Sequence, residues 1–166
     1  VWGDQAWASG ARDEKIAAAV AELDGVPIVN SELVNEGGGI QVDGHGTVLV
    51  TETVQLDPGR NPGLGKAQVE AELARTIGAT DVVWLPRGLT RDSQRFGTRG
   101  HVDIVAAITA PGRLLLHTQT ADEHPDTKVC KEIRHALEGR FDIVDMPAPD
   151  TLTDAEGYVD YSYINH

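Results

Sequence analysis

Helical spacing of apolar residues is the clearest pattern in the chain, and it predicts three helices. Apolar side chains recur at intervals of three and four residues over 12–24, 66–77 and 125–138. Gly25 follows the first of these segments, and a glycine commonly ends a helix. We therefore expect three amphipathic helices separated by other elements.

Shorter apolar runs lie between these helices and predict strands. In chain order, the expected strands are residues 26–29, 40–42, 47–51, 82–85, 102–108, 114–117, 141–144 and 158–164. Asp43-Gly44 is a strong hairpin signal, and Ala110-Pro111-Gly112 is a turn sequence. Strands that alternate with helices in this way indicate the α/β class.

The order strand, strand, helix, strand occurs twice. Residues 46–50 align with 112–116 at an offset of 66, and Glu36 and His101 stand 65 residues apart. We expect two whole units flanked by two partial ones, within a single domain over 1–166. A closed ring of such units needs more sequence, and the chain does not begin with Met, so we expect a fragment of a longer domain.

Composition narrows the classes of partner. The net charge is −12, which argues against nucleic acid and anionic membranes and suits a cationic small ligand. No apolar run approaches the ~20 residues that span a bilayer. The single cysteine excludes an intrachain disulfide, and we expect a cytoplasmic protein.

His101 and Asp103 are the first candidates for chemistry. His101 directly precedes the predicted strand 102–108 and Asp103 lies two residues later, so in extended backbone their side chains would face the same side. Asp103 would then hold the tautomer of His101, or both groups would face one ligand, with the imidazole as general acid and base. A solvated strand end is the alternative without function.

Glu36 stands at the equivalent point of the first unit, before Gly37-Gly38-Gly39. Because the two motifs open equivalent elements of a repeat, we expect Glu36 to converge with His101 and Asp103. Glycines allow close approach of a ligand to the backbone, so an acid there can meet an amine or a guanidinium. A plain glycine-rich bulge is the alternative. We expect no cofactor and no metal, although a metal-dependent hydrolase that uses Glu36, His101 and Asp103 stays open.

Cys130 and Trp2 are weaker candidates for a functional site. Cys130 falls on the apolar stripe of the third predicted helix, where a small buried residue is the ordinary role. Trp2, near the start of the chain, would line a pocket or join the core.

Several motifs resemble the agmatine deiminase and bacterial peptidyl-arginine deiminase family. The similar stretches are Glu36-Gly37-Gly38-Gly39-Ile40-Gln41-Val42-Asp43-Gly44, Trp84-Leu85-Pro86-Arg87-Gly88, Gly100-His101-Val102-Asp103, Asn61-Pro62 and Ser162-Tyr163-Ile164-Asn165. The segment 90–99 is longer than is usual for the family. The resemblance implies the pentein fold, an α/β-propeller of five strand-strand-helix-strand units, here incomplete.

The resemblance also implies a reaction: a guanidino group is hydrolysed to a ureido group and ammonia, as from agmatine to N-carbamoylputrescine in polyamine metabolism. By resemblance, His101 and Asp103 are catalytic, and Glu36, Asp103, Gly37 and Trp2 bind the substrate. The family's nucleophilic Cys lies in a glycine-rich motif that nothing here matches, and an N-terminal substrate Asp is also absent. The 166-residue chain alone is therefore expected to be inactive.

The resemblance leaves alternatives open. The first alternative is an inactive remnant that binds a guanidine or an amine. The second is the metal-dependent hydrolase described above, and the third is an amidinotransferase. Agmatine, free arginine and peptidyl arginine all remain possible substrates. The expected partner is the missing remainder of the domain or a second copy, because an incomplete ring exposes strand edges.

Overall fold

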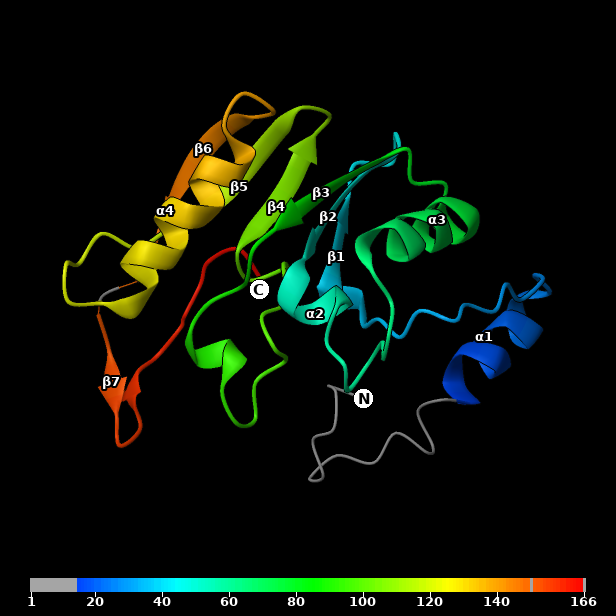
Figure 1. The fold of residues 1–166 in the computed structure, drawn as a ribbon, viewed down its shortest axis with the longest axis horizontal. Helices are drawn as coiled ribbons and strands as arrows, with labels where there is room; N and C mark the ends of the chain where they lie inside the picture. Colours follow the sequence, from blue (N-terminus) through cyan, green and yellow to red (C-terminus); the bar gives the residue numbers. More distant parts are fainter. Residues whose placement is uncertain (1–14, 150, 166) are drawn as a thin grey trace.

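Two small three-stranded sheets form the centre of the molecule (Figure 1). The computed structural model describes residues 15–149 and 151–165. The first sheet contains β1 (Ile40–Val42), β2 (Thr47–Thr51) and β3 (Asp81–Leu85), and the second contains β4 (Ala106–Ala110), β5 (Arg113–Thr118) and β6 (Asp142–Pro147). The fold is mixed α/β, as expected, and the described residues include no closed sheet.

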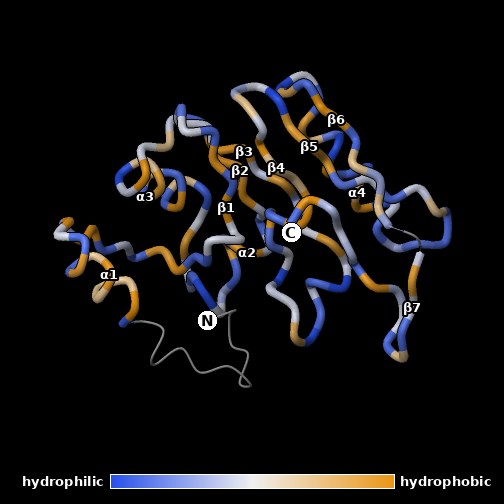
Figure 2. The backbone as a smooth tube through the Cα atoms, turned by 180° about the vertical axis from the view of Figure 1, so that it is seen from behind, coloured by the Kyte–Doolittle hydropathy of each residue, from blue (hydrophilic) through white to orange (hydrophobic). Residues whose placement is uncertain are grey.

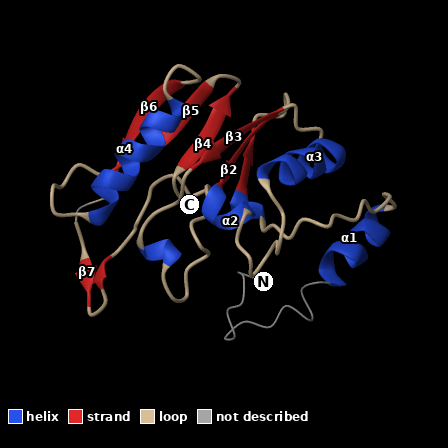
Figure 3. Ribbon diagram, viewed as in Figure 1, coloured by secondary structure: helices blue, strands red, loops and turns tan. Residues whose placement is uncertain are grey.

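The predicted repeat is confirmed by the pairing of the strands. Each sheet has an antiparallel hairpin, β1–β2 or β4–β5, followed by a parallel third strand. A helix makes each parallel connection: α3 (Lys66–Ile77) in the first unit and α4 (Pro125–Leu137) in the second (Figure 3). The hydrogen bond at the start of the third strand also repeats. The Gly46 carbonyl accepts from the Asp81 amide in the first unit, and the Gly112 carbonyl accepts from the Asp142 amide in the second.

Local sequence explains where α3 and α4 begin and end. The side chain of Gln68 accepts from the Gly65 amide at 2.7 Å, and α3 ends at Gly78 with a φ of 73°. At α4, Pro125 occupies the first turn, and His124 Nδ1 accepts from the Asp126 amide at 3.1 Å. No helix within 15–149 or 151–165 has the length and apolarity to cross a membrane.

β2 is buried on both faces, which explains its continuous apolar sequence. Val48 and Val50 pack in the cluster under α3, whereas Leu49 belongs to the larger cluster that includes the apolar stripe of α4. That stripe is the predicted one, with Val129, Ile133 and Leu137 buried. The larger cluster therefore joins the two units, because it combines Leu49, Val83 and Leu85 of the first unit with residues of the second.

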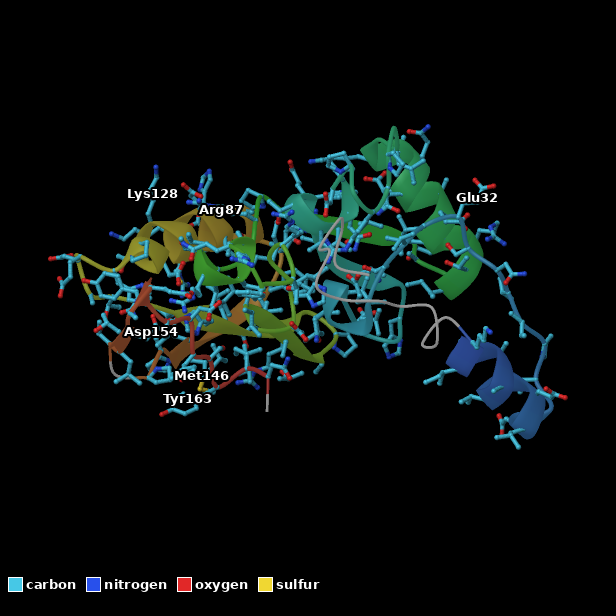
Figure 4. The ribbon with its side chains drawn as sticks, turned by 90° about the horizontal axis from the view of Figure 1, so that it is seen from below. Glu32, Arg87, Lys128, Met146, Asp154 and Tyr163 are labelled. Carbon is cyan, nitrogen blue, oxygen red and sulfur yellow. The ribbon has the colours of Figure 1, made fainter. Side chains whose placement is uncertain are left out.

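The beginning of the described chain packs much less. Helix α1 (Ile16–Asp24) ends at Gly25 as predicted, but it has no buried residue, and Leu23 is 89% exposed. Figures 2 and 4 show this helix apart from the sheets at one end of the molecule. The predicted strand at 26–29 is wrong: within the described ranges the segment pairs with no other strand, and Val26, Ile28 and Val29 are exposed. Residues 12–14 of the predicted first helix lie outside the described residues.

Two further strand predictions need correction. Residues 101–105 form a turn in which the Val102 carbonyl accepts from the amides of Val105 and Ala106, so strand β4 begins only at Ala106. At the far end, Tyr158 alone of the predicted strand 158–164 lies in a strand, at the end of β8 (Gly157–Tyr158), which pairs with β7 (Thr153–Asp154). The sequence prediction also missed the short helix α2 (Glu52–Gln55) and the 3₁₀ turns at Gly37–Gly39 and Arg91–Ser93.

Candidate functional site

Gly38 is the point at which the two predicted motifs meet. The Asp103 amide donates to the Gly38 carbonyl at 3.2 Å. A Cβ on Gly38 would lie 2.5 Å from both Asp103 Oδ2 and His101 Nδ1, closer than side-chain contacts allow. The glycine thus lets the imidazole and the carboxylate lie against the backbone of the first unit. The expected convergence of the two motifs is confirmed.

His101 is 7% exposed and contacts the acid of the other unit. Its Nε2 lies 3.1 Å from Glu36 Oε2. Before it, Gly100 has a φ of 99° and packs directly on Gly88, a close approach that a side chain on either residue would block. The Thr51 hydroxyl at the end of β2 donates to the Gly100 carbonyl at 2.7 Å. The first unit therefore holds the peptide that carries the imidazole.

Glu36 is held by a buried arginine that sequence reasoning missed. Arg60 Nε lies 3.1 and 3.0 Å from the two oxygens of Glu36, Nη1 donates to Asp57 at 2.9 Å, and Nη2 donates to the Thr98 carbonyl at 2.7 Å. The Arg60 side chain is fully buried, which an internal cation tolerates only when its donors are paired. This guanidinium holds both oxygens of Glu36 in place beside His101.

Asp103 has partners of its own. Its Oδ2 accepts from Asn165 Nδ2 at 2.8 Å, so the end of the described chain returns to the site, as the central position of the C-terminus in Figure 1 shows. Burial raises the pKa of the Asp103 carboxyl above 3.8; the charge of His101 opposes this shift, and that of Asp92 adds to it. His101 and Asp103 precede β4, so the prediction that they lie on a strand is wrong, but both side chains face the same point of the backbone at Gly38.

The other predicted site residues are placed as follows. Gly37 is exposed and has open space at its Cβ position, and Trp2 lies outside the described residues. Cys130 is 5% exposed in α4, as expected for a core residue, and burial raises the pKa of its thiol. It lines a hollow of about 400 Å³ with Thr118, Gln119 and Arg134, and no residue around Gly38 lines that hollow.

The arrangement suits proton transfer beside a cation. Glu36 Oε2 lies 3.1 Å from the His101 imidazole, and Asp103 places a second carboxylate beside that imidazole at Gly38. Across 15–149 and 151–165, no three His, Cys, Asp or Glu side chains are grouped to hold a metal ion. The geometry therefore does not favour the metal-dependent alternative.

Comparisons with known proteins agree with the sequence resemblance. The model of the family described as "Porphyromonas-type peptidyl-arginine deiminase" matches residues 1–166. A Streptomyces coelicolor protein named "Putative agmatine deiminase" is 50% identical over 99% of this chain and 51% of its own length. The agmatine deiminase of Pseudomonas putida is 37% identical over 91% of this chain and 44% of its own.

Solved structures show the same fold. An agmatine deiminase of C. jejuni with substrate bound superposes with a TM-score of 0.85 at 20% identity, over 99% of this chain and 48% of the other. The agmatine deiminase of Enterococcus faecalis gives a TM-score of 0.77 at 28% identity, over 93% and 44%. The chain spans about half the length of the curated relatives that it matches.

Proposed function

This chain belongs to the Porphyromonas-type peptidyl-arginine deiminase family, and we propose that it contributes to the hydrolysis of a guanidino group. We propose agmatine as the substrate because the similar proteins described above carry the name agmatine deiminase. The observation that carries the proposal is the meeting of Glu36, His101 and Asp103 around Gly38. An imidazole between two carboxylates is what a cationic, resonance-stabilised substrate needs.

In the proposed reaction, Glu36 and Asp103 accept hydrogen bonds from the nitrogens of the guanidinium. Gly37 has open space at its Cβ position, which leaves room for the substrate, and Trp2 is a further residue that we propose to bind it. A thiolate attacks the guanidinium carbon, His101 gives a proton to one amino group, and the carbon–nitrogen bond breaks so that this group leaves as ammonia. Water then adds to the thiouronium carbon and gives its proton to His101, and the carbon–sulfur bond breaks to release the ureido product and the thiol.

The thiol of this reaction would come from outside the 166 residues. Cys130 is the single cysteine of the chain, and its place in α4 with a raised thiol pKa suits packing rather than attack. The curated relatives are about twice as long, so we propose that the chain is one part of a longer pentein-type catalytic domain of five units. The exposed apolar face of α1 would be covered there by the remainder of the domain or by a second copy.

An ammonia-release assay with agmatine tests this proposal. We expect no turnover by the 166-residue chain, turnover by a protein extended to the length of its relatives, and loss of that turnover in the extended His101→Ala variant. Turnover by the short chain would contradict an external thiol. Turnover in the His101→Ala variant would remove His101 from the mechanism, and loss of turnover on chelation would favour a metal-dependent reaction.

A further inference from the structure

The segment between β3 and His101 is folded around the carboxylate of Asp92. Asp92 Oδ1 accepts from the Thr98 amide at 2.8 Å. Its Oδ2 accepts from the Thr98 hydroxyl at 2.5 Å, the Gly100 amide at 3.0 Å and the His101 amide at 2.9 Å. Hydrogen bonds to a charged acceptor are stronger than those to a neutral one. One side chain thus organises the backbone that leads into the candidate site.

These bonds offset an unfavourable backbone. Phe96 and Arg99 have φ values of 72° and 75°, a region that residues with a side chain rarely adopt. Gly97 packs so closely on the Asp92 backbone that a Cβ there would overlap it. The Asp92 carbonyl also accepts from the Arg99 amide at 3.0 Å. The loop therefore needs Asp92 to keep this conformation.

The two residues before Asp92 are held by two other elements. Before it, the Thr90 amide donates to Asp126 Oδ1 at 2.7 Å at the start of α4. Arg91 Nη2 lies 2.8 Å from Asp154 Oδ2 and 3.1 Å from Glu156 Oε2 on the β7–β8 hairpin, where Figure 4 labels Asp154. The acceptor that meets the His101 amide is thus fixed relative to the second unit.

We propose that Asp92 is a positioning residue that sets the backbone of His101 and so places its imidazole against Glu36. Asp92 holds the amides of Gly100 and His101, while Thr51 holds the carbonyl between them, so the peptide is fixed from two directions. The inference rests on the proposed function only for its consequence in catalysis. Asp92 touches no reacting atom.

The test compares Asp92→Asn with Asp122→Asn, which removes an exposed acid outside the loop. Asparagine has the shape of aspartate but carries no charge. Because both oxygens of Asp92 accept hydrogen bonds, the side-chain NH₂ of the asparagine would face at least one donor, and that hydrogen bond would be lost. Amide hydrogen exchange is measured in the 166-residue chain. In Asp92→Asn we expect the Gly100 and His101 amides to exchange roughly 10- to 100-fold faster, since hydrogen bonds to a charged acceptor are lost.

We expect the exchange rates of the β2 amides to be unchanged in Asp92→Asn. In Asp122→Asn, the exchange rates of the Gly100, His101 and β2 amides should all be unchanged. The imidazole resonances of His101, which report its contact with Glu36, should shift only in Asp92→Asn. Unchanged His101 exchange would overturn the inference, and so would an equal acceleration in β2, which would show a global loss of stability. The exchange result decides the role of Asp92 without substrate. Failure of the proposed function would show separately, as the absence of calorimetric agmatine binding by the wild-type chain.

Discussion

The buried guanidinium of Arg60 should be among the most stabilising side chains near the site. Its four hydrogen bonds reach Glu36, Asp57 and the Thr98 carbonyl, and its side chain is 0% exposed. In Arg60→Met, packing volume is largely kept but the two carboxylates lose their cation. Breaking a buried ion pair in this way costs about 3–5 kcal/mol.

Thermal unfolding gives the measurement. For a domain of this size, that loss corresponds to a fall in Tm of roughly 6–20 °C. Arg113→Ala is the matched control, because Arg113 and Asp142 form an ion pair at 3.5 Å with side chains 59% and 72% exposed. Exposed pairs contribute about 0–1 kcal/mol.

The double variant Arg60→Met/Glu36→Gln tests the cause. If the loss comes from an unpaired carboxylate at Glu36, neutralising that carboxylate should recover part of it. An Arg60→Met variant as stable as Arg113→Ala would refute the reasoning. So would a double variant whose loss is the simple sum of the two single losses.

Two further predictions concern the contact between the units. Gly38→Ala should lower the free energy of unfolding in urea by about 1–3 kcal/mol, because the added Cβ would overlap His101 and Asp103. Gly37→Ala should change this free energy little, because the Cβ position of Gly37 is open. Equal effects of the two substitutions would contradict the contact at Gly38. Burial raises the folded pKa of Asp103 above 3.8, so the folded state binds this proton more tightly and its ionisation costs stability as the pH rises through that raised pKa. Asp103→Asn should therefore gain stability relative to the wild type between about pH 3 and pH 7, and a relative loss over that range would contradict the direction.

Periodicity predicted the repeated unit well, because its signals are local. The segments 47–51 and 66–77 form a strand and a helix with those bounds. The apolar residues of the strand enter both core clusters, and those of the helix enter one. The pairing of Glu36 with His101 also followed from sequence, because equivalent positions of a repeat meet the same neighbours.

The errors arose where the structure depends on distant partners. The apolar run 26–29 has strand composition, but no described strand pairs with it. Val102 and Val105 are buried three residues apart, a spacing that suits the observed turn and was interpreted as part of a strand. Arg60 stands in a loop dense in turn residues, and its partners Glu36 and Thr98 lie 24 and 38 residues away, so no local signal marked it as buried.

Agmatine binding by the 166-residue chain, measured by calorimetry beside putrescine, tests the central claim most directly. Putrescine is an amine without a guanidino group, so it separates guanidinium recognition from general attraction to an acidic protein. The account predicts that agmatine binds more tightly than putrescine, and that Glu36→Gln and Asp103→Asn each weaken agmatine by about 10-fold or more, since each removes a charged acceptor. Equal binding of the two ligands, or agmatine binding that survives both substitutions, would contradict a guanidinium site at Glu36, His101 and Asp103.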